Sequence, residues 1–412
     1  MELRGACIFG QSGGPTSVIN ASAFGVFSAA LESGCITRVL GAAHGIKGVL
    51  AEQLYDISQE DPRELALLKS TPSSALGSCR YKLKDFSQDD TDYRKILSVF
   101  KKYNVRYFFY NGGNDSMDTC DKISRYLESV GYECRVIGVP KTIDNDLYGT
   151  DHCPGFGSAA KYIAASCMEI AQDAAVYDTG AVTIVECMGR NAGWLTAAAS
   201  LASFQGAGPD LIYLPEVDFD LERFLGDVTR VWSEKHNCLV AVSEGVHDSK
   251  GTFVSEYGAG TAAADAFGHK QMGGAAAFLS QAVKERLGCK TRAIEFSLLQ
   301  RCAAHLASKT DVDEAVWMGQ EAVAAALRGE SGKMVAIRRQ PGKDYVPEVI
   351  LLPLTETANA EQVFPLGWIT PDGCGIRREF ADYALPLIQG APDYAWENGL
   401  PRFARLKKIL AK

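Results

Sequence analysis

The stretch that decides the fold class is residues 107–116, which read YFFYNGGNDS. Its four aromatic residues predict a buried strand, and the two glycines that follow predict a turn into the helical pattern of residues 116–130. Apolar runs, polar turns and helical patterns alternate in this way along the chain, which is typical of an α/β fold with mostly parallel sheets. Further strands are expected at residues 6–9, 136–139, 181–186 and 239–243, and further helices at residues 15–31, 157–176 and 264–287.

Polar or glycine-rich residues follow each predicted strand at once. They are residues 11–14, 111–116, 140–146, 187–190 and 244–245. Ligands of open α/β sheets bind outside the carboxyl ends of the strands, so these five turns predict one shared crevice. Several predicted helices begin directly after the turns, where free backbone N–H groups and the positive end of the helix dipole favour a bound phosphate.

The composition is that of an ordinary globular protein. With 412 residues, 47% of them hydrophobic, the chain is long enough for two lobes with large cores. A formal net charge of −8 without a long Lys/Arg run argues against a general nucleic-acid binder. The twelve cysteines are scattered without a CxxC pair, which favours reduced thiols in a cytoplasmic protein. We expect no signal peptide and no membrane span, because no apolar run approaches ~20 residues.

The segment that carries most chemical information is residues 140–146, PKTIDND. Asp144 and Asp146 are two residues apart, so an extended backbone would place both carboxylates on one face, where they repel unless they share a cation or a proton. Such a pair suits one carboxylate as a base and the other as a recruiter of Mg²⁺. A solvated turn is the alternative, since Asp and Asn are common turn residues. The preceding strand and the neighbouring Lys141 favour the functional interpretation.

Two glycine-rich loops have the features of phosphate-binding loops. Gly112 and Gly113 would let a ligand approach the backbone before a helix that starts near Ser116, which is also a candidate helix cap. Residues 11–14, with Pro15 at the first helical turn, repeat the pattern. Each loop alone is also compatible with an ordinary turn between a strand and a helix.

Taken in order, these segments resemble the phosphofructokinase family. The matching pieces are SGGP at 12–15, LGS at 76–78 with Arg80, GGNDS at 112–116, P-x-TIDND at 140–146, Glu186 with MGR at 188–190, SEG at 243–245 and QR at 300–301. The resemblance spans residues 10–301, nearly three quarters of the chain. It implies two Rossmann-like three-layer lobes with mostly parallel sheets and an active site in the cleft between them.

The resemblance also implies how the lobes divide the work. Residues 1–155 with part of 302–412 are expected to form the phosphoryl-donor lobe. Residues 156–301 with the remaining C-terminal part are expected to form the sugar-phosphate lobe. The segment after Ser331 reads as a C-terminal elaboration.

The family's residue roles are implied position by position. The catalytic residues would be Asp144 as the general base for the 1-hydroxyl of fructose 6-phosphate, Thr142 beside it, and Arg190 as a stabiliser of the transferred group. Mg²⁺ would be bound by Asn114 and Asp146. The donor would be bound by Gly13, Gly14, Arg80, Gly113, Asp115, Ser116 and Lys141. The sugar phosphate would contact Thr142, Asp144, Met188, Gly189, Arg190 and Glu244, with Arg292 and Arg301 on the 6-phosphate.

Two positions bear on the identity of the donor. ATP users in the family resemble GGDGS and PGTIDND, whereas this chain has Asp115 at the last glycine of the first motif and Lys141 at the glycine of the second. A carboxylate at Asp115 would repel the α-phosphate of a nucleotide, and the Lys141 ammonium would attract compact pyrophosphate. The alternative is that Asp115 caps the following helix and Lys141 is solvated.

The prediction is therefore a pyrophosphate-dependent 6-phosphofructokinase, a cytoplasmic transferase of glycolysis and gluconeogenesis that is reversible and forms homodimers or homotetramers. Three departures from the family pattern are Asn114 in place of Asp, Leu298 in place of His, and Ala181 in place of an Arg contributed across a subunit interface. The alternatives are an ATP-dependent phosphofructokinase, a kinase of another sugar phosphate such as sedoheptulose 7-phosphate or tagatose 6-phosphate, and a catalytically silent regulatory paralogue.

Overall fold

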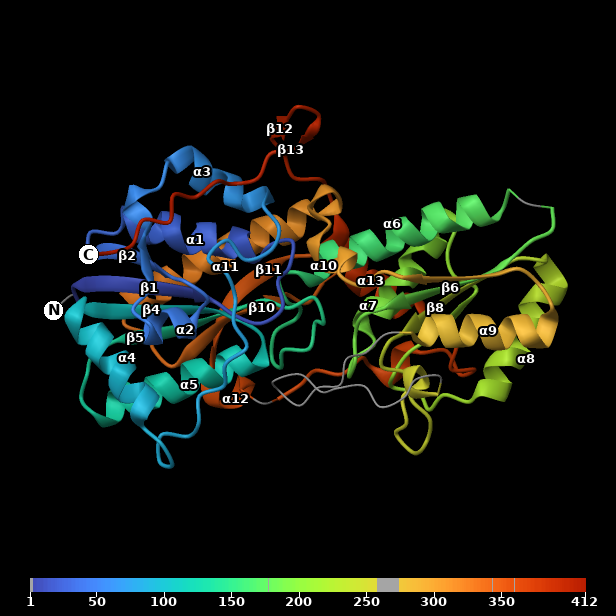
Figure 1. Ribbon diagram of the computed structural model, residues 1–412, viewed down its shortest axis with the longest axis horizontal. Coiled ribbons are helices and arrows are strands. Elements are labelled where there is room, and N and C mark those ends of the chain that lie inside the picture. Colours follow the sequence, from blue (N-terminus) through green and yellow to red (C-terminus); the bar gives the residue numbers. More distant parts are fainter. Residues whose placement is uncertain (1–2, 177, 258–273, 343, 359) are drawn as a thin grey trace. The chain divides into compact units, whose positions relative to one another are not determined.

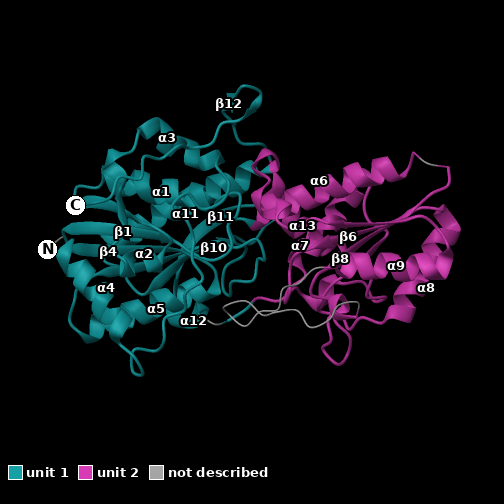
Figure 2. Ribbon diagram, viewed as in Figure 1, with its two compact units in different colours: residues 1–155, 307–361, 390–412 teal, residues 156–306, 362–389 magenta. Residues whose placement is uncertain are grey.

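The chain folds into two compact units. The computed structural model describes residues 3–176, 178–257, 274–342, 344–358 and 360–412. Unit 1 comprises residues 1–155, 307–361 and 390–412, and unit 2 comprises residues 156–306 and 362–389 (Figure 2). The segment after Ser331 therefore contributes to both units.

Unit 1 is built on a seven-stranded sheet with the order β11-β10-β5-β4-β1-β2-β3 (Figure 1). The inner strands pair in parallel, and the edge strands β11 and β3 pair antiparallel with their neighbours. The bounds are β1 Gly5–Gln11, β2 Ile36–Ala42, β3 Leu54–Asp56, β4 Val105–Gly112, β5 Arg135–Pro140, β10 Lys333–Arg339 and β11 Pro347–Pro353.

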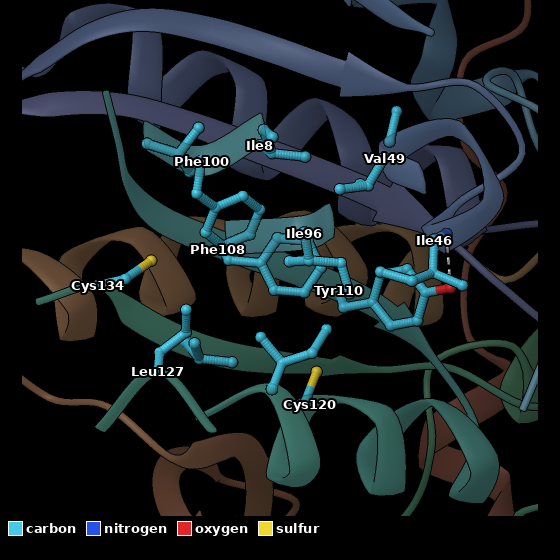
Figure 3. Close-up of a cluster of buried hydrophobic side chains, with 14 of the residues drawn as sticks. Ile8, Ile46, Val49, Ile96, Phe100, Phe108, Tyr110, Cys120, Leu127 and Cys134 are labelled. Carbon is cyan, nitrogen blue, oxygen red and sulfur yellow. Dashed lines mark hydrogen bonds between the residues drawn. The ribbon is translucent and has the colours of Figure 1, made fainter. Parts of the chain in front are cut away.

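Helices cover both faces of this sheet because successive strand residues point to opposite sides. On one side Phe108 and Tyr110 of β4 pack in a core with α2 (Ile46–Leu50), α4 (Thr91–Lys102) and α5 (Asn114–Ser129) (Figure 3). The Tyr110 hydroxyl also accepts a hydrogen bond of 3.1 Å from the N–H of Ile46, which satisfies the buried phenol. On the other side Tyr107 and Phe109 pack in a core with α1 (Ile19–Glu32) and α11 (Lys309–Leu327).

The two helices α1 and α11 approach closely at a pair of glycines. A Cβ on Gly25 would lie 2.1 Å from the carbonyl oxygen of Val316, and one on Gly319 would lie 2.3 Å from that of Ser22. Both distances are far below van der Waals contact, so the glycines are required for this packing.

The end of the chain closes one edge of the sheet in unit 1. The N–H of Asp56 donates to Ile409 O at 2.8 Å, and the N–H of Ala411 donates to Leu54 O at 2.7 Å. The buried Glu60 carboxylate accepts the N–H groups of Lys407 and Lys408 at 2.6 and 2.7 Å. Backbone pairing along β3 leaves fewer exposed edge groups for another chain. The remaining elements of unit 1 are α3 Pro62–Leu67, α12 Leu354–Thr357, β12 Trp396–Glu397 and β13 Leu400–Pro401.

Unit 2 contains a parallel four-stranded sheet with the order β7-β8-β6-β9. Its elements are α6 Phe156–Ala174, β6 Val182–Cys187, α7 Trp194–Ala198, β7 Leu211–Tyr213, α8 Leu221–Lys235, β8 Cys238–Ser243, α9 Ala275–Leu287, β9 Thr291–Glu295, α10 Leu299–Cys302 and α13 Arg378–Ala384. The helices α8 and α9 share a core with β6, β7 and β8. A separate aromatic cluster is formed by Trp194, Phe364, Trp368, Phe380 and Tyr383.

The five predicted strands are confirmed, and the fold class is the predicted mostly parallel α/β arrangement. The helix predicted over residues 15–31 begins only at Ile19, so the prediction of Pro15 at the first helical turn is wrong. The hydroxyl of Thr16 accepts the N–H of Val18 at 3.2 Å, and such a local side-chain turn competes with helix formation. The predicted helices 116–130 and 157–176 are observed as α5 and α6. Of the helix predicted over residues 264–287, residues 264–273 lie outside the described part.

The structure also bears on the predictions of reduced cysteines and of no membrane span. All twelve cysteines are free thiols, and most of them are buried. Within the described ranges, no helix combines the length and the apolar character needed to cross a bilayer.

Replacing Gly25 by Ala is expected to lower the free energy of unfolding by about 1–3 kcal/mol, because the added methyl group overpacks the contact between α1 and α11. The matched control is Gly226→Ala in α8, where a Cβ would meet nothing within 4 Å. That control is expected to gain about 0.5–1 kcal/mol, because Ala is the better helix former. Urea denaturation followed by circular dichroism measures both changes, and equal effects at the two positions would contradict the packing argument.

Candidate active site

The loop after β1 is held by the segment around residue 78. The Ser78 hydroxyl donates to Gly13 O at 2.6 Å, and the N–H of Gly13 donates to Cys79 O at 3.3 Å. Gly13 has a φ of +76°, a conformation that glycine adopts without a steric cost. Residues 11–14 and 76–80 are distant in sequence, and these hydrogen bonds hold them side by side.

The buried side-chain amides of Gln11 and Asn20 hold these two segments together. The Gln11 Nε2 donates to Asn20 Oδ1 at 2.9 Å, and Gln11 Oε1 accepts the N–H of Leu76 at 3.0 Å. Asn20 Nδ2 donates to Thr71 O at 2.9 Å, and its Oδ1 also accepts the N–H of Ala75 at 2.8 Å. Sequence reasoning missed Asn20, because a lone Asn inside a helical pattern carries no local signal.

The loop after β4 leads directly into α5. A Cβ on Gly112 would lie 1.9 Å from the hydroxyl oxygen of Ser116, so only glycine leaves room for that buried side chain. Gly113 is the N-cap residue and the cap has no side-chain hydrogen bond, so the alternatives in which Ser116 or Asp115 caps this helix are wrong. The first N–H groups of a helix without a side-chain cap favour a bound anion.

Lys141 reaches the loop of residues 11–14 from the end of β5. Its side chain is buried, and its Nζ lies 2.9 Å from the position that a Cβ on Gly13 would occupy. Its N–H donates to Gly112 O at 3.0 Å. The alternative of a solvated lysine is therefore wrong. A buried ammonium group among backbone loops favours a negatively charged ligand.

Asp115 differs from Lys141 in its surroundings. Its carboxylate is exposed on the first turn of α5, and its Oδ1 lies 3.5 Å from Nζ of Lys82. Arg80, also predicted to bind the donor, is exposed on the neighbouring segment. The structure thus places these charged groups and the two glycine-rich loops in the same unit.

The carboxylates Asp144 and Asp146 come together, but not on an extended backbone. Asn145 between them has a φ of +57°, so the prediction of an extended pair is wrong. The Thr142 hydroxyl accepts the N–H of Asp144 at 3.1 Å and also lies 3.4 Å from Asp144 Oδ2. Burial, together with the negative charges of Asp144 and Glu361, raises the pKa of Asp146 to about 7.

Asn114 lies next to Asp146 and offers a further oxygen. Its Nδ2 is 3.5 Å from Asp146 Oδ2, and its Oδ1 is a buried atom for which the described residues provide no hydrogen-bond partner. Oxygen and nitrogen of an amide are exchanged by a flip of the side chain, so the amide is able to turn its oxygen toward the carboxylate. The described residues contain no cluster of three or more His, Cys, Asp or Glu side chains that would bind a metal alone. These oxygens suit a hard divalent cation that takes further ligands from a substrate.

In unit 2 the residues 188–190 are held against the end of β8. Gly189 has a φ of +121°, and a Cβ there would lie 2.6 Å from Ala192 O. The Ser243 hydroxyl donates to Gly189 O at 2.6 Å, and the N–H of Gly189 lies 3.4 Å from Glu244 Oε1. A Cβ on Gly245 would lie 2.0 Å from Arg190 O, so the two turns touch.

Two further residues support this turn of unit 2. Gln300 Oε1 accepts the N–H of Met188 at 3.2 Å, so α10, the short helix that also carries Arg301, is held against this turn. Glu186, the strand residue before the turn, is buried and accepts the N–H of Ala276 at 2.8 Å. Burial raises the pKa of Glu186.

Arg292 is the predicted sugar-phosphate residue that the unit does not bring to this turn. It lies on β9 opposite Thr183, three residues before the pair of Glu186 and Glu295 at the carboxyl edge. That separation is roughly 10 Å at ~3.3 Å per strand residue. Its NH1 lies 3.8 Å from Asp173 Oδ2 instead. Of the positions that depart from the family pattern, Ala181 is buried and Leu298 is exposed.

Comparison with known proteins identifies the family. The profile of the family described as Phosphofructokinase matches residues 7–326. The chain belongs to the phosphofructokinase family. Among phosphofructokinases, the pyrophosphate–fructose 6-phosphate 1-phosphotransferase of Halomonas elongata is 46% identical over 97% of this chain and 96% of its own length. The enzyme of the same name from Xanthomonas campestris pv. campestris is 46% identical over 98% of this chain and 97% of its own length.

The phosphofructokinase fold is also found among solved structures. The crystal structure of a pyrophosphate-dependent phosphofructokinase from Nitrosospira multiformis superposes with a TM-score of 0.90 at 41% sequence identity. The superposition covers 99% of this chain and 98% of that chain. Both the order of the motifs and the three-dimensional arrangement therefore place the chain in this family.

Replacing Gly13 by Ala is expected to weaken anion binding in unit 1 by at least about tenfold, because the new methyl group would displace the Lys141 ammonium. The matched control is Gly131→Ala, which has a φ of +66° and open space around the Cβ. Both variants are expected to lose about 1–2 kcal/mol of stability from the left-handed backbone. Calorimetric titration with sulfate as the probe anion separates the two effects. An unchanged sulfate affinity in Gly13→Ala would contradict the role given to Lys141.

Proposed function

We propose that the chain catalyses the reversible transfer of a phosphoryl group from pyrophosphate to the 1-hydroxyl of fructose 6-phosphate. The products are fructose 1,6-bisphosphate and phosphate. The observation that carries the proposal is the buried Lys141 side chain against Gly13, in the loop predicted to bind the phosphoryl donor. The names of relatives at 46% identity support the same donor and the same sugar.

Unit 1 is proposed to bind pyrophosphate. The Gly13–Gly14 and Gly113 backbones, the Ser116 hydroxyl, and the cations of Arg80 and Lys141 would hold its oxygens. Asp115, exposed on the first turn of α5, would place a negative charge where a nucleotide donor continues beyond its second phosphate. Lys141 would attract the compact anion and Asp115 would reject the longer one, so the pair would select the donor.

Asp144 is proposed as the general base. As the sugar oxygen forms its bond to the phosphorus, the bond from that phosphorus to the bridging oxygen of pyrophosphate breaks, and Asp144 accepts the hydroxyl proton. The Thr142 hydroxyl, which donates to Asp144 Oδ2 at 3.4 Å, would hold the carboxylate in place. Arg190 would neutralise charge on the transferred group.

Mg²⁺ is the cofactor proposed for this chemistry, with Asn114 and Asp146 as its protein ligands. When bound, it would supply positive charge to the phosphate oxygens that carry the developing negative charge. The buried Asn114 oxygen without a hydrogen-bond partner among the described residues supports this assignment, because a cation is able to satisfy it. Asn114 replaces the carboxylate of the family pattern, so the chain would bring one negative charge fewer to the ion.

Unit 2 is proposed to bind the sugar phosphate. Met188 and Gly189 would contact the sugar through their backbone and complement its shape. Glu244 would accept hydrogen bonds from the sugar hydroxyls, and Arg301 would bind the 6-phosphate. Arg292 was predicted for the same phosphate, but its place on β9 weighs against its joining Arg301 within one unit. The family resemblance further supports a cytoplasmic homodimer or homotetramer that acts in glycolysis and gluconeogenesis.

A comparison of donors tests the proposed function. With Mg²⁺ and fructose 6-phosphate, kcat/KM for pyrophosphate is expected to exceed that for ATP by at least about a hundredfold, or roughly 2.7 kcal/mol. The double variant Asp115→Gly with Lys141→Gly is expected to lower kcat/KM for pyrophosphate, because the buried Lys141 ammonium acts more strongly on an anion than the exposed, screened Asp115 carboxylate that is lost with it. The product is measured by a coupled assay of fructose 1,6-bisphosphate. If ATP serves the wild type at least as well as pyrophosphate, the proposed donor is wrong.

The variant Asp144→Asn tests the general base. Turnover is expected to fall by at least ~10³, because the amide has the size of the carboxylate but accepts no proton. The control Asp313→Asn removes an exposed carboxylate from α11 and is expected to retain full turnover. Thermal unfolding of both variants checks that the fold is intact. A variant of Asp144 that keeps more than a tenth of the activity would refute the assignment.

A further inference from the structure

A buried ionic cluster lies in unit 1 beside the segment that carries Asp144, and the proposed reaction does not use it. We call His152, Asp151, Glu314, Arg339 and Tyr345 the His152 cluster. His152 is 2% exposed, its Nδ1 lies 2.9 Å from Asp151 Oδ1, and its Nε2 lies 2.8 Å from Glu314 Oε2. Arg339 NH2 lies 3.1 Å from Asp151 Oδ1, and the Tyr345 hydroxyl donates to Glu314.

The geometry requires His152 to be an imidazolium. Ionised carboxylates only accept hydrogen bonds, so both ring nitrogens must carry a proton to bond to Asp151 and Glu314. Burial opposes the charge, but the Glu314 and Asp151 carboxylates outweigh it and raise the pKa of His152 to about 9. With Arg339 included, two positive groups face two negative ones, so the cluster is neutral as a whole.

Stability alone does not account for such a cluster. Buried ion pairs lose their hydration, and apolar side chains of the same volume are often at least as stabilising. What charged hydrogen bonds add is direction, because each bond fixes both an angle and a distance. The effect of the His152 cluster therefore depends on which backbone segments its hydrogen bonds hold in place.

One side of the cluster is anchored to β10 and α11. The N–H of Asp151 donates to Ile337 O at 2.7 Å, and the N–H of Ile337 donates to the Thr150 hydroxyl at 3.0 Å. Glu314, the partner of His152, projects from α11. Three residues beyond His152, the N–H of Gly155 donates to Asp311 Oδ1 at 2.8 Å, which is a second anchor on the same helix.

The other side is bonded to the segment that carries the proposed base. The N–H of Cys153 donates to Asn145 Oδ1 at 2.9 Å, and the N–H of Thr142 donates to Pro154 O at 3.2 Å. These bonds attach to residues on either side of Asp144. Residues 150–155 therefore lie between the fixed α11 and the loop 142–146, with His152 at the middle of the connection.

We propose that His152 is a positioning residue, which fixes the loop of Thr142, Asp144 and Asn145 to α11 through its hydrogen bond to Glu314. The inference rests on the proposed function for its kinetic consequence and on the contacts above for its structural one. A base displaced by about 1 Å costs on the order of 10²-fold in rate, because proton transfer depends on hydrogen-bond distance. His152 touches no proposed substrate group and is not a catalytic residue.

Two substitutions at His152 separate the two hydrogen bonds. The amide nitrogen of His152→Asn occupies the place of Nδ1 and keeps the bond to Asp151, whereas that of His152→Gln occupies the place of Nε2 and keeps the bond to Glu314. We expect His152→Asn to lower kcat by about 10- to 100-fold with KM for both substrates within about twofold. We expect His152→Gln to retain kcat within about fivefold.

A third substitution adds a pH readout. Glu314→Gln keeps an acceptor for Nε2 but removes a negative charge, which leaves Asp151 as the carboxylate facing the ring, with Arg339 and Tyr345 nearby. The stabilising effect of His152 is complete below its unfolded pKa of about 6.5 and is lost as the pH rises through about 9. In Glu314→Gln the folded pKa falls, so kcat and thermal stability are expected to decline at a lower pH than in the wild type.

The closing experiment compares these variants with Glu60→Gln, which weakens a buried carboxylate contact at the chain's end, far along the sequence from the loop. Steady-state kinetics with pyrophosphate are combined with amide hydrogen exchange at Thr142 and Cys153. We expect faster exchange at both amides and a lower kcat in His152→Asn, and neither change in Glu60→Gln at a similar loss of melting temperature.

The outcomes distinguish the two proposals. A wild type that transfers no phosphoryl group from pyrophosphate defeats the proposed function, while the exchange rates still decide whether His152 holds the loop. Unchanged exchange at Thr142 and Cys153 in a folded His152→Asn overturns the inference. So does a drop in kcat that Glu60→Gln reproduces, because the effect would then follow from lost stability alone.

Discussion

The constraint on which unit 1 depends is that β1, β4 and β5 run parallel and end at one edge of the sheet. Each strand is followed by a turn with polar or charged groups, and parallel pairing brings these turns together whatever their separation in sequence. The position of the Lys141 side chain follows from this arrangement, because the buried side chain extends from the end of β5 to the loop after β1. An ammonium group in such a place is tolerated where backbone oxygens or a bound anion offset its lost hydration.

Close packing by glycine shapes the same edge of the sheet. Gly112 leaves space for Ser116, and Gly13 leaves space for Lys141, so in both places the absence of a side chain makes room for a polar one. The turn at Gly189 in unit 2 combines a positive φ with a close approach, because a Cβ there would lie 2.6 Å from Ala192 O, and the Ser243 hydroxyl donates to Gly189 O. In each unit, glycine is required by the approach of a neighbouring group and not by flexibility.

Sequence reasoning succeeded where the signal is local and failed where it is not. The strands were found because a short apolar run that ends in glycine or proline has few other structures open to it. The start of α1 was misplaced because Thr16 binds the backbone of Val18, a contact that composition does not reveal. The relation between Asp144 and Asp146 was misjudged because the left-handed Asn145 is stabilised by Cys153, eight residues away. Asn20 and His152 were missed, because their hydrogen-bond partners Thr71 and Glu314 lie far along the chain.

The sequence by itself determined the fold class, the order of the strands' polar ends and, through the motifs, the family. These features depend on patterns within a few residues, and local physical chemistry is sufficient to read them. Only the tertiary structure decided that Lys141 is buried, that Asp115 faces Lys82, that Arg292 lies away from the carboxyl edge of its sheet, and that His152 bonds to Glu314. Burial, charge pairing and register arise when distant segments pack together, because hydration is lost and hydrogen bonds form only at that step.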